Sequence, residues 1–125
     1  MIGVTAPPSR IYIVYQDGLF AQGMRSLLEC RDLAEIVGIE SDTAKALVAM
    51  RALKPEVVIV EESSDTDRPS GLVAAFVEEA VAPRIVSLSL SRDYATVYES
   101  TRVPTRSPDE FARAVHGDRA LRLPV

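Results

Sequence analysis

The stretch "EVVIV", residues 56–60, places four β-branched apolar residues in a row, directly before the polar stretch "EESSDTDRPS", residues 61–70. An apolar run of this length predicts a strand rather than a helix. A strand without polar alternation is expected in the middle of a parallel sheet, where helices cover both faces. The run therefore predicts an α/β fold, and the turn-rich stretch after it predicts a loop.

Three further segments on either side of this run are short and rich in β-branched or aromatic residues, which is typical of strands. They are "RIYIVY" (10–15), "LAEIVGIE" (33–40) and "RIVSLSL" (84–90). Between them the apolar residues recur at helical spacing, as do Phe20, Met24, Leu27 and Leu28. Alternating strands and helices predict a parallel sheet covered on both faces. About five strands in 125 residues favour the flavodoxin-like doubly wound order 2-1-3-4-5.

The last part of the chain divides into an unclear segment, 91–106, and a clear helix, "SPDEFARAVHG", 107–117. Ser107 at the N-cap and Glu110 at the third helical position form a capping box. Gly117 is expected to end this helix, because glycine commonly follows the last helical residue. The sequence thus predicts a final amphipathic helix of about ten residues.

Composition limits the classes of partner. The chain is 47% hydrophobic and 26% charged, which is usual for one globular domain. A formal net charge of −4 gives this segment no electrostatic reason to bind nucleic acid. The single cysteine, Cys30, excludes an internal disulfide and is typical of the cytoplasm. No apolar run approaches the roughly 20 residues that a membrane span needs, and residues 1–9 are expected to be a flexible tail.

The chain resembles the receiver domain of two-component response regulators, and most closely the NarL/FixJ/LuxR type, in which a helix-turn-helix follows the receiver. The matching segments, in the family's order, are "LFAQGMRSLLE" (19–29), "AEIVGIESDTAKAL" (34–47), "KPEVVIVE" (54–61), "PRIVSLS" (83–89) and "SPDEFARAV" (107–115). The resemblance implies a receiver-like domain over residues 10–117. The chain is shorter than the family pattern before the last strand, so helix 4 is expected to be shortened or missing.

The resemblance also places the family's phosphorylation pocket on this sequence. In that family two acids after strand 1 hold Mg²⁺, and strand 3 ends in the aspartate that accepts a phosphoryl group. A hydroxyl follows strand 4, and a lysine follows strand 5. On this chain the acidic pair falls on Tyr15 and Gln16, the acceptor on Glu61, the hydroxyl on Ser89 and the lysine near Pro104.

These residues are poorly suited to the family's chemistry. Mg²⁺ prefers hard oxygen ligands such as carboxylates, whereas Tyr15 and Gln16 are neutral and Asp17 stands one position late. Phosphoryl transfer depends on positioning and on neutralising the charge of the moving group. Glu61 is also one methylene longer than aspartate. We therefore expect no metal, no cofactor, no enzymatic activity and no phosphorylation by the family's usual route.

Several roles stay open for these residues. Glu61 is either a solvated carboxylate at a strand end or a mimic of phosphorylated aspartate that reaches toward Ser89. Tyr15 is either an aromatic packed into the vacated metal site or part of a small-molecule pocket. In both cases the pocket, made of Tyr15, Gln16, Asp17, Glu61, Ser89 and Pro104, is expected to be degenerate.

The sequence therefore predicts a cytoplasmic regulatory and dimerisation domain of a DNA-binding transcriptional regulator, controlled by a small ligand or a protein partner. DNA would be bound only through a helix-turn-helix domain outside this chain, with residues 118–125 as the start of a linker. The homodimer is expected to use Phe111, Ala114 and Val115, or segment 91–106. The alternatives are a stand-alone protein-binding adaptor and a switch that can still be phosphorylated.

Overall fold

A computed structural model describes residues 8–31, 34–62 and 71–122, with side chains described as far as residue 116. The elements follow the chain in the order β1 (Ser9–Val14), α1 (Gly18–Glu29), β2 (Ala34–Glu40), α2 (Thr43–Leu53), β3 (Val57–Glu61), α3 (Gly71–Glu79), β4 (Arg84–Leu88), β5 (Thr96–Glu99) and α4 (Pro108–Arg122). The five strands form one sheet in the order β2-β1-β3-β4-β5. The predicted flavodoxin-like order is therefore confirmed.

The direction of the last strand differs from the prediction. β1, β2, β3 and β4 pair in parallel, but β5 pairs with β4 in antiparallel fashion, with Ile85 opposite Tyr98 and Val86 opposite Val97. Residues 89–95, between β4 and β5, hold no helix, which confirms that the helix expected between the fourth and fifth strands of a receiver domain is missing. A parallel connection needs a crossover of a dozen or more residues. The short connection therefore forces a reversal, and the expectation of an entirely parallel sheet was wrong for β5.

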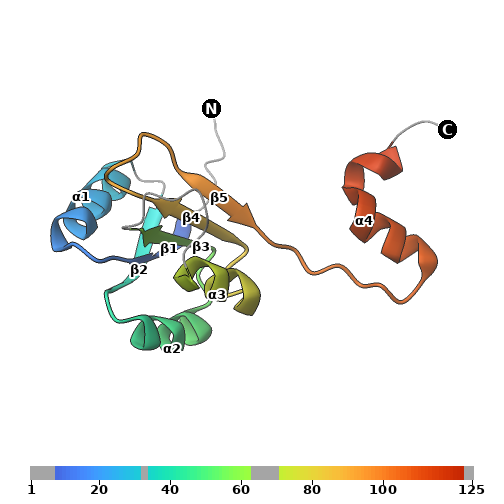
Figure 1. The fold of residues 1–125 in the computed structure, drawn as a ribbon, viewed down its shortest axis with the longest axis horizontal. Helices are drawn as coiled ribbons and strands as arrows, with labels where there is room; N and C mark the ends of the chain where they lie inside the picture. Colours follow the sequence, from blue (N-terminus) through green and yellow to red (C-terminus); the bar gives the residue numbers. More distant parts are fainter. Residues whose placement is uncertain (1–7, 32–33, 63–70, 123–125) are drawn as a thin grey trace.

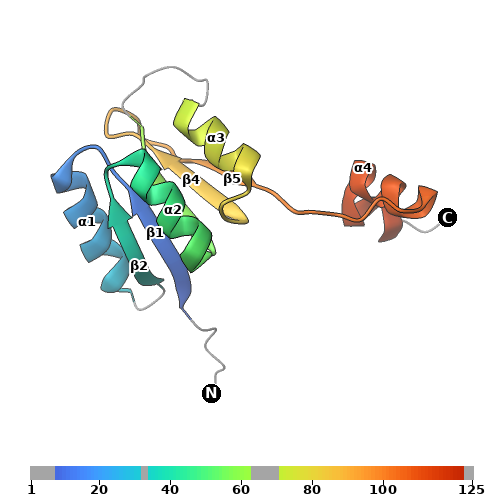
Figure 2. The same ribbon diagram turned by 90° about the horizontal axis from the view of Figure 1, so that it is seen from below.

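The sheet has an apolar core on each face, because successive residues of a strand point to opposite sides. Tyr12, Val58 and Ile85 pack on one face with residues of α2 and α3, whereas Ile11, Ile13 and Ile59 pack on the other with Phe20 of α1. Figures 1 and 2 show this division, with α1 on one side of the sheet and α2 and α3 on the other. The fold is thus doubly wound.

The pairing of β1 with β2 contains a local irregularity. The register shifts so that Ile11 is opposite Ile36 but Tyr12 is opposite Gly38, which leaves Val37 as the extra residue of a β-bulge. A Cβ atom on residue 38 would overlap the Tyr12 ring. Only glycine fits there, because the buried Tyr12 ring lies directly against the backbone of β2.

The last helix lies apart from the sheet. Figures 1 and 2 both show residues 100–107 leading away from β5 to α4, with α4 at a distance from every other element. Ser107 caps the helix as predicted, since its Oγ accepts the backbone N–H of Glu110 at 3.2 Å, whereas the Glu110 carboxylate accepts the N–H of Arg106 instead of that of Ser107. The prediction that Gly117 ends it was wrong, because α4 continues to Arg122. Residues 118–122 are mostly good helix formers, which outweighs one interior glycine.

Within the described part of the chain, no helix has both the length and the apolar character required to cross a membrane.

Candidate functional site

The candidate site lies where β1 and β3 end side by side. The two strands pair in parallel, with Val14 opposite Val60, so the residues that follow them meet at the carboxyl edge of the sheet. There the Oε1 atom of Glu61 accepts two backbone hydrogen bonds, from the N–H groups of Gln16 at 2.7 Å and Asp17 at 2.8 Å. The structure thus joins Glu61 to the junction between β1 and α1.

Both carboxylates of this site serve the beginning of α1. Asp17 is the N-cap residue, and its Oδ1 atom accepts the N–H of Leu19 at 2.8 Å. The first N–H groups of a helix have no partner within the helix, and the helix dipole favours negative charge beside them. Asp17 therefore caps α1 through Leu19, and Glu61 holds the two residues that lead into the helix, Gln16 and Asp17.

Glu61 is not the solvated carboxylate that the sequence suggested, since its exposed fraction is only 7%. A buried carboxylate needs hydrogen bonds to offset the loss of water, and the amides of Gln16 and Asp17 supply them. Its carboxylate is directed at the start of α1 rather than at Ser89. The Ser89 hydroxyl instead lies 2.9 Å from the hydroxyl of Ser91, in the connection after β4.

The other predicted residues have different surroundings. Tyr15 is half-buried, packs partly against the α1-side core, and lines a cleft of about 390 Å³ together with Ile39 of β2 and Arg25 of α1. The Gln16 side chain is exposed. Pro104 is exposed in the segment that leads away from β5 (Figure 1), so it does not join the site. The antiparallel β5 carries the chain to the opposite edge of the sheet, where Ser100 N–H donates to Pro83 O at 3.0 Å.

Sequence reasoning missed a second buried carboxylate, Glu62, which it assigned to a loop. Glu62 and Ser87 are both buried, and the Ser87 hydroxyl donates a hydrogen bond to Glu62 Oε1. Tyr98 of β5 packs partly against the same side of the sheet. Burial, and then the negative charge of Glu62, raise the pKa of the Tyr98 phenol above its ordinary value of 10.0. The available signal was strand alternation, since Glu62 continues the buried series Val58 and Val60.

This arrangement does not form a catalytic group. A serine hydroxyl beside a carboxylate requires a general base such as histidine to become a nucleophile. The one histidine of the sequence, His116, is exposed on α4, and Figure 1 shows α4 apart from β4, the strand that carries Ser87. The Glu62–Ser87 pair therefore serves to satisfy a buried charge.

The residues at the carboxyl edge also do not fit the magnesium ion that the resemblance implies. Tyr15 and the Gln16 side chain are neutral, and the carboxylates of Asp17 and Glu61 already accept backbone N–H groups. Two carboxylates that each already give one oxygen to backbone N–H groups offer too few anionic oxygens for Mg²⁺. Across the described ranges, no three His, Cys, Asp or Glu side chains gather as metal ligands.

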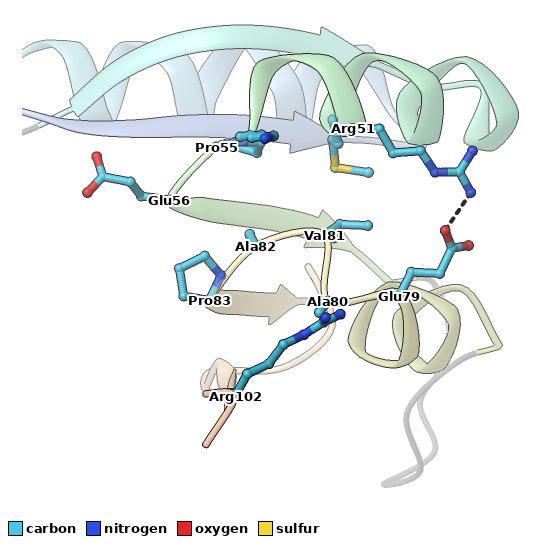
Figure 3. A pocket seen from close by; sticks show the side chains of 11 residues that line it. Arg51, Pro55, Glu56, Glu79, Ala80, Val81, Ala82, Pro83 and Arg102 are labelled. Carbon is cyan, nitrogen blue, oxygen red and sulfur yellow. Dashed lines mark hydrogen bonds and ion pairs between the residues drawn. The ribbon is translucent and has the colours of Figure 1, made fainter. Parts of the chain in front are cut away.

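A cavity of about 610 Å³ lies at the opposite edge of the sheet, between the ends of α2 and α3 (Figure 3). Its wall carries the Arg51–Glu79 ion pair, and Figure 3 shows the Arg102 side chain extending toward Ala80. Lys54 and Glu56 also line it. Opposite charges and the carbonyl ends of two helices balance the cations, so the cavity has no strong preference for an anion.

No family model matches the chain, and no curated protein sequence matches it. Among solved structures, it is similar to the signal receiver domain of the protein assigned as response regulator NarL from Mycobacterium tuberculosis. The two share 21% sequence identity with a TM-score of 0.58, over 71% of each chain. At this identity the similarity concerns the fold, so the chain has the receiver type of flavodoxin-like fold.

Proposed function

We propose that this chain is a regulatory receiver-like domain of a DNA-binding transcriptional regulator, and that it acts without conventional aspartate phosphorylation. Three observations support the first part: the strand order, the family-like segments in their family order, and the similarity to the NarL receiver domain. DNA would be bound by a helix-turn-helix domain outside this segment, because the acidic net charge of −4 disfavours contact with a polyanion.

The hydrogen bonds of Glu61 carry the second part of the proposal. A phosphoryl acceptor must present a free carboxylate oxygen in line with the donor, beside cations that neutralise the moving group. Glu61 is buried, and its Oε1 atom already accepts two backbone N–H groups, from Gln16 and Asp17. In this position the carboxylate holds the β1–α1 junction together. Its role is then to stabilise the structure and not to accept a phosphoryl group.

Control then comes from a small molecule or a protein partner, and the output is homodimerisation. The half-buried Tyr15 lines a cleft of about 390 Å³ beside the β1–α1 junction, which is within the usual size of a ligand site. For the dimer, Phe111 and Val115 of α4 present exposed apolar surface. Apolar surface of this kind favours association.

The test is intact-mass spectrometry after incubation with acetyl phosphate and Mg²⁺, with a receiver that carries the usual acidic pair as the positive control. The mass of this chain should not change, while the control gains one phosphoryl group. A gain of one phosphoryl group that disappears in Glu61→Gln would overturn the proposal and favour a working phosphorylation switch. Pull-down of a protein partner by a native protein without a DNA-binding domain would favour the adaptor function instead.

A further inference from the structure

One face of the sheet is incompletely covered. On the α2–α3 side, Ile85 of β4 is buried under α3. On the α1 side, Val86 is only partly buried. Val97 of β5, which is paired with Val86, is exposed. Of the helices in the described ranges, none covers this part of the sheet in Figures 1 and 2, because α1 lies toward β2. The α1 side of β4 and β5 therefore has room for a further helix.

An apolar groove adjoins this uncovered face. Leu90, which follows β4, lines a cleft of about 270 Å³ with residues of α1, including Leu19 and Leu27. The exposed fractions of Leu19 and Leu90 are 76% and 70%. We name this surface, made of Leu19, Leu27, Leu90 and Val97, the acceptor face.

α4 carries the complementary surface. Phe111, Ala114 and Val115 are spaced to lie on one side of the helix, and all three are exposed, Phe111 and Val115 to 59% each. Six of the nine exposed large apolar side chains in the described part of the chain lie on the acceptor face or on α4. Apolar surface concentrated on two separate elements indicates two halves of one interface.

The segment between β5 and α4 directs the helix away from its own acceptor face. Residues 100–107 span at most about 29 Å when extended, and they begin at the edge of the sheet where Ser100 N–H binds Pro83 O. Pro104 and Pro108 each disfavour helical backbone in the residue before them, so Val103 and Ser107 tend to keep this segment extended. Residues 101–107 are all exposed. In the structure this segment leads away from the sheet, so α4 does not lie on the acceptor face of its own chain (Figures 1 and 2).

We infer that α4 of each chain docks on the acceptor face of a second copy, in a reciprocal exchange. This inference rests on the proposed homodimerisation and names its surfaces. Exchange of an identical element closes a twofold dimer and covers both copies of the apolar surface. The occupant of the acceptor face is therefore the partner's last helix, carried there by segment 100–107.

The first experiment measures the dimer by analytical ultracentrifugation at tens of micromolar. Phe111→Glu and Leu90→Glu change the two opposite surfaces, and each should weaken the dimer on the order of 100-fold, since truncated anchors at interfaces commonly have such effects. Val48→Glu, on the exposed surface of α2, is the matched control and should leave the dimer intact. A dimer that survives Phe111→Glu or Leu90→Glu overturns the exchange.

The second experiment separates docking between chains from docking within one chain. In a Cys30→Ser background, Leu27→Cys and Val115→Cys are combined and treated with a short bismaleimide cross-linker. Peptide mass spectrometry of the denatured products should find residues 27 and 115 joined within a covalent dimer. The same link within a monomer, or a link only between two copies of residue 115, contradicts the exchange but leaves dimerisation standing. If the wild-type protein is only monomeric, both the exchange of α4 and the proposed homodimerisation are wrong. The phosphorylation test above does not depend on this outcome.

Discussion

Glu61 Oε1 lies 2.7 Å from the backbone nitrogen of Gln16, a hydrogen bond between residues 45 positions apart in the chain. The same oxygen also accepts the N–H of Asp17 at 2.8 Å. These bonds connect the last residue of β3 to the beginning of α1, at the edge where receiver-type domains are expected to place their chemistry. Here the carboxylate stabilises the junction instead.

Removal of the Glu61 carboxylate should therefore reduce stability. Glu61→Ala leaves two partly buried backbone N–H groups without their acceptor, which should lower the free energy of unfolding by about 1–3 kcal/mol. Glu61→Gln keeps an acceptor oxygen but loses the charge, so it should cost less, about 1 kcal/mol. Urea denaturation followed by circular dichroism measures both.

The control for this pair is Glu29→Ala, which removes an exposed i,i+4 partner of Arg25 and should change the free energy of unfolding by less than about 0.5 kcal/mol. If Glu61→Ala is no more destabilising than Glu29→Ala, the structural role of Glu61 is wrong.

Ser87 should be more important for stability than Ser89, although only Ser89 occupies the position that the family resemblance singled out. Ser87→Ala removes the hydroxyl that donates to the buried Glu62, which should cost about 1–3 kcal/mol. Ser89→Ala removes two exposed hydrogen bonds to Ser91, one to its hydroxyl and one from its backbone N–H, with an expected effect of about 0.5 kcal/mol or less. Chemical denaturation of the two variants side by side checks the order, and the reverse order would contradict it.

Stability should fall in alkaline solution. Burial, and then the charge of Glu62, raise the pKa of Tyr98 in the folded state above 10.0, and burial and Glu40 do the same for Tyr12. The folded state therefore retains protons that the unfolded chain has released, so stability is fully present below pH 10 and is lost as the pH rises through the folded pKa values. Between about pH 9 and 11, the free energy of unfolding of the Tyr98→Phe variant should fall less than that of the wild type. Urea midpoints across this range test the prediction, and parallel curves for the two proteins would refute it.

Gly38→Ala should destabilise the sheet, because the new methyl group overlaps the buried ring of Tyr12. Overpacking of this kind costs typically about 1–3 kcal/mol. Gly71→Ala, at the first position of α3 with open space around it, is the matched control and should leave stability unchanged within about 0.5 kcal/mol. Thermal unfolding of both variants decides whether the close approach at Gly38 is responsible, and equal melting temperatures would show that it is not.

Restoring the acids should create a magnesium response that the wild type lacks. The variant with Tyr15→Asp, Gln16→Asp and Glu61→Asp places carboxylates at the ends of both β1 and β3, and millimolar Mg²⁺ should raise its melting temperature, because a ligand of the folded state stabilises it. The wild type should melt at the same temperature with and without Mg²⁺. A comparable rise in the wild type would show that the existing residues bind the cation after all.

Local patterns in the sequence determined most of the fold. The run "EVVIV" identified the central strand, and the alternation of strands with helices led to the order β2-β1-β3-β4-β5 that the structure has. The shortened connection before the last strand pointed to the missing helix. These features can be predicted from the sequence because the spacing of apolar side chains along a strand or a helix depends only on neighbouring residues.

Only the tertiary structure decided the direction of β5, the partners of Glu61 and Glu62, and the separation of α4 from the sheet. Glu61 was recognised as a site residue, but its backbone donors come from a junction that strand pairing brings beside it. Glu62 was assigned to a loop because it belongs to a polar, turn-rich stretch, and its burial beside Ser87 of another strand cannot be read from that stretch. The physical reason is that a side chain's burial and hydrogen bonds depend on residues distant in the chain, whereas the period of an element depends on residues close by.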